Sequence, residues 1–383
     1  MTKPLLSIVV PTKDRYDCLK CLIALIDGFK RPDIEMIIQD NTCDNTAFLK
    51  YLNESEYSFV KYYHTQEQIS VCDNSELAIL HATGEYISFI GDDDGVVQCI
   101  MEYILWMKQN SIDALIVQNP IYTWPGVQAK VFDFSGTLML KKSKGKLTPI
   151  SPLLELHKVL SMGGITLARL PRIYQGIVSK HALEQLHEAC GTFFPGPSPD
   201  MANAVALSFI VKKCFYLDIP LIISGQSKKS SAGMGASHQH KGEIKSVPFL
   251  PQNCEELWEK NIPKIWTGET VWAESCVKAL KNMGHGELYS EFNLNALYAK
   301  FLLNNSQYAL DYLRDEPYKS HIVWYKFAYY YCLFSKDRIL ALFRNVMFML
   351  VFKNNRKVIK GLDSILNASA YLMKHISPVR HLQ

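Results

Sequence analysis

The sequence predicts an α/β protein built on a doubly wound, mainly parallel sheet that is flanked by helices. Short apolar runs alternate with helix-like segments over the first part of the chain, and this alternation is typical of βαβ units. The chain has 383 residues and is 48% hydrophobic, so it can bury a sizeable core.

The expected elements alternate regularly up to about residue 120. The predicted strands are Leu6–Val10, Glu35–Gln39, Val60–His64, Tyr86–Ile90 and Ala114–Val117. Helices are expected over Tyr16–Phe29, Asn45–Leu52, Val71–His81 and Ile100–Lys108.

Beyond residue 120 the pattern weakens and then becomes helical. Residues 122–171 are irregular, and the basic run Lys141–Lys146 is expected to be a solvated loop. A mobile Gly- and Ser-rich segment is expected at Ser227–Ser237. The remaining elements are a strand over Ile173–Val178, helices over His181–Cys190 and Met201–Val211, and an apolar run Leu221–Ser224. We therefore expect three regions, 1–120, 121–250 and a helical 251–383.

The bulk composition argues against several classes of protein. A net charge of +4 is too mild to indicate nucleic-acid binding. Among the ten cysteines only Cys18 and Cys21 are close in sequence, so no zinc cage is indicated and a reduced, cytoplasmic setting is expected. No signal peptide is recognisable. The apolar stretch Ile339–Phe352 falls short of the ~20 residues that cross a bilayer.

Positive charge gathers near the C-terminus. Lys353, Arg356, Lys357 and Lys360 have the spacing of one helix face. This face is either an interfacial membrane helix or the solvated side of a packed helix. If the face belongs to an interfacial membrane helix, a lipid-diphosphate-linked acceptor is the expected substrate.

Polar clusters follow three of the predicted strands. They are Pro11–Arg15, Asp40–Thr42 and Gly91–Asp94. Ligands of doubly wound sheets bind at the carboxyl ends of the strands, where these clusters are expected to meet. Asp40 either accepts a hydrogen bond from a base or ribose or caps the next helix, a role that suits Asp44 better.

The triplet Asp92, Asp93 and Asp94 indicates a cation. Adjacent carboxylates repel one another unless a cation intervenes, and Mg²⁺ or Mn²⁺ binds one or two carboxylates together with substrate phosphates. A solvated acidic turn between Gly91 and Gly95 is the alternative.

Taken together, these motifs resemble family 2 glycosyltransferases of the GT-A fold. The resemblance rests on the segments Ser7–Arg15, Ile37–Asn41 and Ala82–Asp94 and on Asn74. It implies a nucleoside pocket with contributions from Asn74 and Asp92 beside Pro11, Thr12, Asp14, Arg15 and Asp40. It also implies Asp93 as the direct metal ligand, while Asp92 and Asp94 share the metal and ribose contacts. Lys13, Gln39, Asp73 and Gly91 depart from the family pattern.

The resemblance also implies a catalytic base. Inverting members use a carboxylate near the start of a helix on the acceptor side, and Asp200 follows a proline-restricted turn before the predicted helix Met201–Val211. Asp200 is therefore a candidate base, with a helix cap as the alternative.

Further candidates lie in or just after the segment Ser227–Ser237 and in one glycine turn. The resemblance implies a loop here that closes over the donor diphosphate, with Lys228 and Lys229 in contact with phosphates. His238 and His240 are either additional metal ligands or ordinary surface histidines. The turn Met162-Gly163-Gly164 borders the acceptor pocket or is an ordinary loop.

The sequence thus predicts an inverting, metal-dependent glycosyltransferase that moves a sugar from a nucleotide-sugar donor to a glycan or lipid-linked acceptor. Synthesis of a bacterial surface polysaccharide such as O-antigen or capsule is the expected setting, on the inner face of the cytoplasmic membrane. The alternatives are a sugar nucleotidyltransferase and a catalytically silent sugar- or lipid-binding scaffold.

Overall fold

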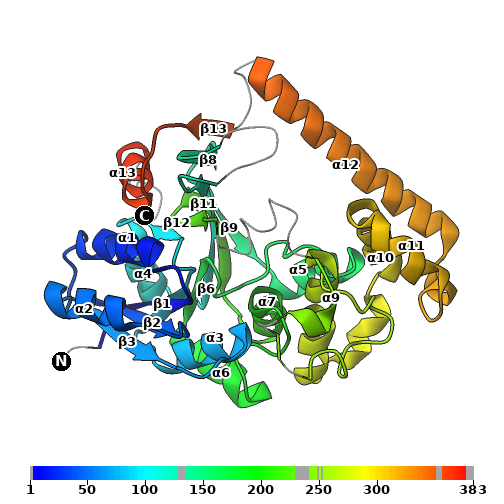
Figure 1. Cartoon of the computed structure of the whole chain (residues 1–383), viewed down its shortest axis with the longest axis horizontal. Coiled ribbons are helices and arrows are strands. Elements are labelled where there is room, and N and C mark those ends of the chain that lie inside the picture. The colour runs from blue at the N-terminus through cyan, green and yellow to red at the C-terminus, as the bar shows by residue number, and fades with distance from the viewer. Residues whose placement is uncertain are drawn as a thin grey trace.

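A computed structural model describes residues 3–127, 134–228, 241–247, 250–251, 253–350 and 356–376. Figure 1 shows a twisted sheet layered with helices and, beside it, a helical part that leads into the long helix α12 (Trp324–Leu350). The expected α/β class with a helical C-terminal region is confirmed.

In the described residues, the central sheet has eight strands in the order β3-β2-β1-β4-β10-β6-β11-β9. The first four are parallel to one another, and β6 is parallel to β11. β10 and β9 run antiparallel to their neighbours. The strands are β1 (Leu6–Thr12), β2 (Ile34–Asp40), β3 (Val60–His64), β4 (Tyr86–Phe89), β6 (Ala114–Gln118), β9 (Leu147–Ile150), β10 (Gly176–Ser179) and β11 (Cys214–Pro220).

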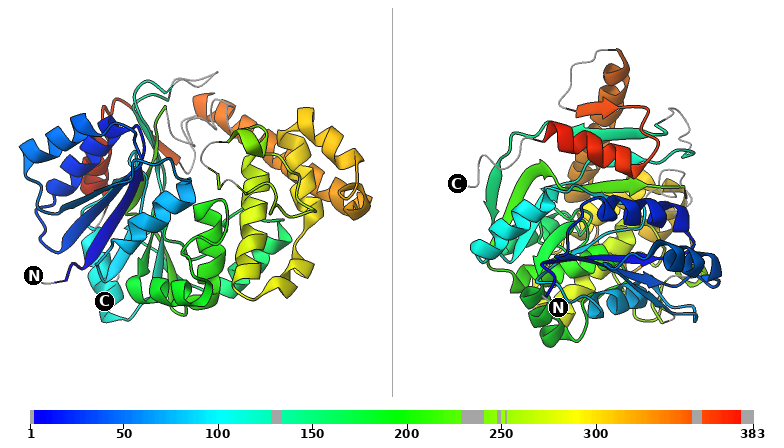
Figure 2. Two further views of the ribbon diagram at one scale, coloured as in Figure 1. Left: turned by 60° about the horizontal axis from the view of Figure 1, so that its bottom comes forward. Right: turned by 90° about the vertical axis from the view of Figure 1, so that its left-hand side faces the viewer.

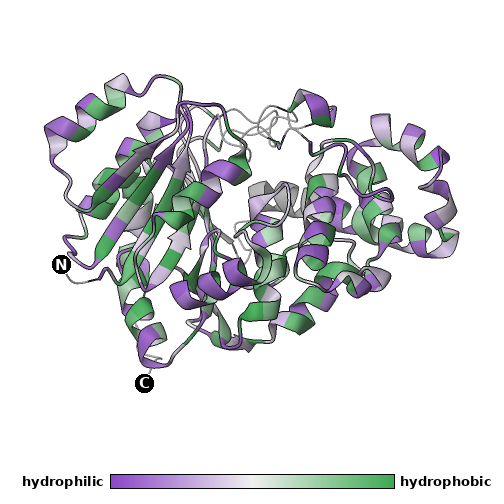
Figure 3. Cartoon of the chain, turned by 90° about the horizontal axis from the view of Figure 1, so that it is seen from below, coloured by the Kyte–Doolittle hydropathy of each residue, from purple (hydrophilic) through white to green (hydrophobic). Residues whose placement is uncertain are grey.

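Alternating apolar residues bury both faces of this sheet. In β1, Leu6, Ile8 and Val10 enter one core layer and Val9 enters the opposite layer, as the period of two in a strand requires. The helices that cover the sheet are α1 (Tyr16–Asp27), α2 (Thr46–Ser55), α3 (Val71–Leu80), α4 (Ile100–Gln109), α6 (Lys180–Cys190) and α7 (Pro199–Ile210). Figure 3 shows hydrophobic residues recurring along the strands between these layers.

A second, smaller sheet lies beside the central sheet. Its order over the described residues is β13-β8-β7-β12-β5, from β5 (Gly95–Val96), β7 (Ile121–Thr123), β8 (Thr137–Lys141), β12 (Ile222–Gln226) and β13 (Arg356–Ile359). Strands β7 and β8, with β9 and helix α5 (Pro152–Ser161), lie in or at the edge of residues 122–171, where the sequence shows no regular pattern. The predicted loop at Lys141–Lys146 is confirmed for residues 142–146, between β8 and β9.

The predicted basic helix face near the C-terminus is wrong for its described part. Arg356 and Lys357 lie in strand β13, which pairs with β8 so that Arg356 stands opposite Lys141. The β-branched Val358 and Ile359 favour a strand, and this pairing outweighs the helical spacing of the charges. Lys353 lies outside the described residues.

The last described helix returns to the start of the chain. α13 (Ile365–His375) packs against α1 and β5, and Ser369 Oγ donates a hydrogen bond of 2.8 Å to the Val96 carbonyl. Figure 2 shows this helix beside the N-terminal elements, away from the helical part. Residues 356–376 therefore join the sheet domain in space.

The helical part packs around a hydrophobic core that it shares with α5 and α7. It includes α9 (Gly268–Asn282), α10 (Leu294–Asn304), α11 (Ser306–Arg314) and the start of α12, which meet around Val277, Leu297 and Phe301. Within the described ranges, no helix is both long and apolar enough to cross a bilayer.

Candidate active site

The acidic triplet lies where β1 and β4 end side by side. These strands are parallel, with Val9 opposite Phe89, so Thr12 and the segment after β4 reach the same edge. Thr12 Oγ1 donates to Asp92 Oδ2 at 2.6 Å. Arg15 forms ion pairs with both leading carboxylates, with Nε 3.0 Å from Asp92 Oδ1 and Nη1 3.6 Å from Asp93 Oδ1. The structure thus brings together Thr12, Arg15, Asp92 and Asp93, as expected.

Asp94 differs from its two neighbours because, among the described residues, it forms no ion pair with Arg15 and is held by hydrogen-bond donors alone. Oδ2 accepts from the Gly91 amide at 2.8 Å, and Oδ1 accepts from the Gly225 amide at 2.7 Å. The side-chain amide of Gln175 donates to both oxygens. These contacts give Asp94 a structural role, namely fastening β12 to the end of β4.

The triplet is buried and poorly compensated in charge. Asp92, Asp93 and Asp94 are each at most 4% exposed, and Arg15 is the cation that pairs with them in the described chain. Burial raises the pKa of Asp92 to about 7, although Arg15 opposes this shift. Burial and the neighbouring Asp93 likewise raise the pKa of Asp94 to about 7. A further cation would stabilise the ionised cluster.

Asp40 is enclosed by protein donors. Its Oδ2 accepts from the hydroxyls of Tyr16 and Tyr62, each at 2.7 Å, and Oδ1 accepts from the Thr42 amide at 2.9 Å. The residue is fully buried. In this structure Asp40 orients two tyrosines beside the site, and its contact with a nucleoside remains a prediction.

The other residues predicted to hold the nucleoside lie along the same edge. Pro11 and Thr12 end β1 opposite the end of β2. Asp14 has a left-handed backbone with φ 58° and donates its amide to Thr42 Oγ1; such strain is typical of functional sites. Asn74 is buried, and its Oδ1 has no hydrogen-bond donor among the described residues.

Asp200 lies in the first turn of α7, as predicted. Its Oδ1 accepts hydrogen bonds from the Ser198 hydroxyl and from the Met201 amide, so the residue does stabilise the helix start. The preceding turn is held from two sides. Cys72 Sγ contacts the Gly196 carbonyl, and Ser275 Oγ of α9 accepts from the Ser198 amide at 2.8 Å.

Two residues near Asp200 were not predicted from the sequence, and one of them, Tyr174, also lies close to the triplet. Tyr174 is within electrostatic range of Asp93, Asp94 and Asp200, and burial together with these carboxylates raises its pKa well above the usual value. Arg172 is near Asp200, and its buried Nη1 has no hydrogen-bond acceptor among the described residues. Both lie in the segment before β10, where no local motif marks them.

Burial is the main influence on the pKa of Asp200, the candidate base. It raises the pKa of Asp200 above the ordinary value, while the Ser198 hydroxyl, the Met201 amide and the Arg172 cation oppose the shift. A carboxylate with a raised pKa is better suited to accept a proton from a hydroxyl.

The structure leaves the metal ligands open. No group of three or more His, Cys, Asp or Glu in the part of the chain that is described could hold a metal ion. His238, His240 and Lys229 lie outside those residues. Asp92 Oδ1 is buried and accepts no hydrogen bond in good geometry although it pairs with Arg15. With Asp93 beside it, the excess negative charge suits a divalent cation that also binds substrate phosphates.

Comparison with known proteins matches the first part of the chain to a family. Residues 7–152, which contain Thr12, Arg15 and the acidic triplet, match the family model described as "Glycosyl transferase family 2". The resemblance predicted from the sequence is confirmed for residues 7–152. A curated relative, the GalNAc(5)-diNAcBac-PP-undecaprenol beta-1,3-glucosyltransferase of Campylobacter jejuni, is 27% identical over 143 residues. That match covers 37% of this chain and 45% of the relative's length.

Two solved structures show a remote likeness. S. aureus TarS 1-349 in complex with UDP-GlcNAc gives a TM-score of 0.48 at 14% identity, covering 80% of this chain and 79% of that one. The mannosyltransferase PcManGT of Pyrobaculum calidifontis in complex with GDP-Man and Mn2+ gives a TM-score of 0.40 at 14% identity, covering 90% of this chain and 88% of that one.

Proposed function

We propose that this protein is an inverting glycosyltransferase that moves a sugar from a nucleotide-sugar donor to a hydroxyl of a glycan or lipid-diphosphate-linked saccharide. One observation carries the proposal: the buried Thr12, Asp92 and Asp93 and the partly exposed Arg15 meet at the strand ends within the region that matches the glycosyl transferase family 2 model.

The donor would bind across the ends of β1, β2 and β4. Pro11, Thr12 and the strained Asp14 would form the wall of the nucleoside pocket, and the buried Asn74 Oδ1 would accept a hydrogen bond from the ligand. Arg15 would turn from the carboxylates toward the diphosphate, because phosphate oxygens suit a guanidinium well.

Asp92 and Asp93 would hold a divalent cation, Mn²⁺ or Mg²⁺. When bound, the cation supplies charge stabilisation for the departing nucleoside diphosphate. Asp94 would support the site by fixing β12, as its contacts with Gly91 and Gly225 indicate. His238 and His240 stay candidates for additional ligands.

Asp200 would be the general base. Its Oδ2 would take the proton from the acceptor hydroxyl as that oxygen bonds to the anomeric carbon. The bond from this carbon to the nucleoside diphosphate breaks in the same displacement, with both electrons leaving on the phosphate oxygen. A single displacement inverts the anomeric configuration.

The acceptor class follows from the curated relative. The name of that enzyme specifies an undecaprenol-diphosphate-linked saccharide, and we extend this class of acceptor to the present chain, in synthesis of a bacterial surface polysaccharide. Such an acceptor would place the enzyme at the inner face of the cytoplasmic membrane. The predicted basic helix face does not form in the described residues, since Arg356 and Lys357 lie in β13.

A panel of nucleotide sugars, screened by thermal shift with and without Mn²⁺, tests the proposal. At a ligand concentration of 100 times Kd, binding to the folded state adds about 2.7 kcal/mol, which raises Tm by roughly 5 °C. Asp93→Asn should lose the Mn²⁺-dependent part of this shift, and the exposed Asp17→Asn should keep it. Absence of stabilisation by every donor would refute the proposal, and donor binding without any turnover would favour the scaffold alternative.

A further inference from the structure

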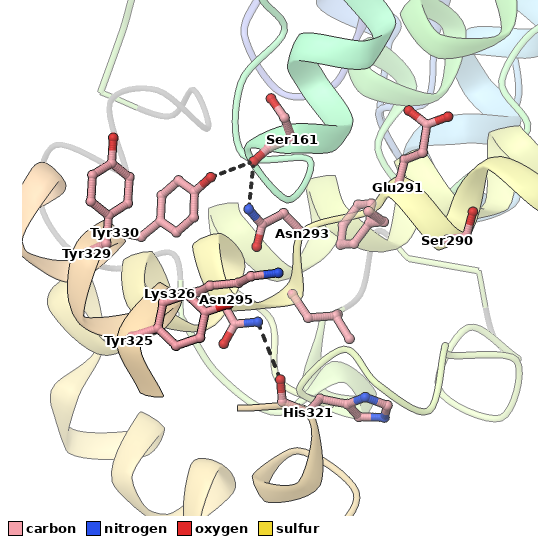
Figure 4. Close-up of a pocket in the computed structure, with 12 residues that line it drawn as sticks. Ser161, Ser290, Glu291, Asn293, Asn295, His321, Tyr325, Lys326, Tyr329 and Tyr330 are labelled. Carbon is pink, nitrogen blue, oxygen red and sulfur yellow. Dashed lines mark hydrogen bonds between the residues drawn. The ribbon is translucent and has the colours of Figure 1, made fainter. Parts of the chain in front are cut away.

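A second concave site lies in the helical part of the molecule. It has a volume of about 810 Å³ and is lined by the end of α5, the start of α10 and the first turns of α12. Figure 4 shows Tyr325, Tyr329 and Tyr330 extending from α12 on one side, with Asn293 and Asn295 of the α10 start facing them. This pocket falls within the size range of sites that hold small ligands.

Hydrogen bonds hold the walls of this pocket in place. Asn293 Nδ2 donates to the Ser161 carbonyl at 3.0 Å, and its Oδ1 accepts from the Ala296 amide at 3.1 Å. Asn295 Oδ1 accepts from the Val323 amide at 2.8 Å. These bonds join α5, α10 and the entry to α12, so the pocket is organised before a ligand binds.

The glycine turn singled out in the sequence forms part of this frame. Gly163 has φ 66°, and a Cβ there would lie 2.6 Å from the Asn293 carbonyl oxygen and 2.8 Å from the Leu297 amide nitrogen. Only glycine allows α5 to end this close to α10. The turn Met162-Gly163-Gly164 therefore shapes the wall next to Asn293.

Several side chains at the pocket lack polar partners. Tyr325 is 74% exposed and Tyr329 is 62% exposed. In the described part of the chain, the hydroxyls of these two residues and the Lys326 amine form no hydrogen bond or ion pair. Glu291 pairs through Oε2 with His157 Nδ1 at 2.6 Å, which leaves Oε1 as an acceptor. Exposed rings beside unused donors and acceptors are typical of a binding surface.

We propose that this pocket binds a saccharide, namely sugar units of the acceptor that lie away from the reacting hydroxyl. A sugar ring presents C–H groups on its faces and hydroxyls at its rim. The Tyr325 and Tyr329 rings would contact the C–H groups, because the aromatic face is the negative part of the ring quadrupole. Lys326 and Glu291 would bond the hydroxyls. With one cationic amine and one carboxylate, the pocket has no excess positive charge to select a nucleotide or phosphate.

The helices connect this pocket with the proposed base. α5 and α9 both pack against α7, which begins beside Asp200, and Ser275 of α9 holds the turn before it. The assignment of the saccharide as acceptor rests on the proposed function, whereas saccharide binding itself does not.

Saturation-transfer NMR with maltotriose, cellotriose and N,N′,N″-triacetylchitotriose tests the proposal on the full-length chain. We expect at least one of these trisaccharides to bind the wild type. The double variant Tyr325→Ala, Tyr329→Ala should weaken that binding by roughly tenfold or more through loss of two ring contacts. Trp324→Ala is the matched control, since Trp324 is 70% exposed on the same helix but does not line the pocket.

The same variants are then screened with nucleotide sugars, and their thermal shifts should equal that of the wild type. If no trisaccharide binds, or if the double variant binds as well as Trp324→Ala, the pocket is not a saccharide site. If trisaccharides bind but no nucleotide sugar does, the pocket proposal stands and the proposed function fails.

Discussion

Asp200 combines a structural role and a proposed chemical role in one carboxylate. Oδ1 stabilises the first turn of α7, and Oδ2 is the atom we assign to proton transfer. Asp200→Asn keeps an oxygen for the helix start but removes the basic site. We expect kcat to fall by ~10²–10⁴ with little change in Tm. Steady-state kinetics and a melting curve measure both quantities.

The matched control for this variant is Asp17→Asn. Asp17 also lies in the first turn of a helix, α1, but is exposed. Its turnover should equal that of the wild type. Equal turnover in Asp200→Asn as well would remove Asp200 from the mechanism.

Arg172 should set the pH at which Asp200 becomes active. Its positive charge lowers the pKa of Asp200, which burial raises. Arg172→Gln should therefore raise this pKa further, and the acidic limb of the kcat/KM profile should move to higher pH. A purely structural role for Arg172 would lower kcat/KM at every pH without moving the limb.

Single residues could be predicted where a local motif marks them. Thr12, Arg15, Asp92 and Asp93 follow predicted strands, and the parallel order of those strands brings them together. Arg172 immediately precedes the predicted strand Ile173–Val178, and Tyr174 and Gln175 lie within it. They reach the site only because β10 inserts between β4 and β6. Sequence spacing holds no information on such an insertion.

At the scale of elements, the position of β12 depends on a close approach of its backbone to the triplet. A Cβ at Gly225 would lie 1.8 Å from the Asp93 carbonyl oxygen. Gly225→Ala must therefore displace β12 and should cost about 3 kcal/mol of unfolding free energy or more. Gly268→Ala is the control, because nothing lies within 4 Å of a Cβ there. Urea unfolding compares the two, and equal stability would contradict the close contact.

Helix α9 contains a buried carboxylate that should make stability depend on pH. Burial raises the pKa of Glu274 to about 7, while the Glu259 amide and Lys278 oppose the shift. Because the folded state binds this proton more tightly than the unfolded state, protonated Glu274 contributes stability at pH values below its unfolded-state pKa. This contribution is lost as the pH rises through the folded-state pKa of about 7. The stability of Glu274→Gln relative to the wild type should rise between pH 5 and 8, by at most about 3 kcal/mol.

Melting curves at both pH values measure this difference. The exposed Glu256→Gln should show no change relative to the wild type. A constant difference between Glu274→Gln and the wild type across this range would mean that Glu274 does not titrate there.

Helices and strands could be predicted where they alternate regularly along the chain. The predicted strands and helices up to residue 120 agree with the structure within a few residues, because buried parallel strands are continuous apolar runs. β9 contains Pro149 and has only four residues, and β13 carries the charges of an apparent helix face. Such short strands form because they pair with strands distant in sequence, and the local propensity of their residues does not determine them.

At the scale of the whole molecule, the last described helix, α13, packs against the N-terminal elements α1 and β5. Ile365 of α13 is fully buried and lies against Gly95, directly after the acidic triplet. Ile365→Ala should cost ~2–5 kcal/mol of unfolding free energy and weaken donor binding, because β5 loses its support. Ile339→Ala, at a residue 52% exposed, should change stability by less than ~0.5 kcal/mol. Equal effects of the two variants would contradict the docking of α13.

The sequence predicts the helical character of the third region but not the return of residues 356–376 to the sheet. The alternation of strands with helices and the periodicity of apolar residues report only on residues that are close in sequence. The contacts of α13 with α1 span most of the sequence, and nothing in either helix specifies the other.

The position of α13 has a consequence for the order of synthesis. The first sheet strands leave the ribosome long before α13, which covers β5 beside the proposed donor site. Because domains generally fold from the N-terminus as they are made, the sheet domain must remain incomplete while the helical part is being translated. A nascent chain arrested anywhere before residue 365 would therefore lack the support that α13 gives to the proposed donor site.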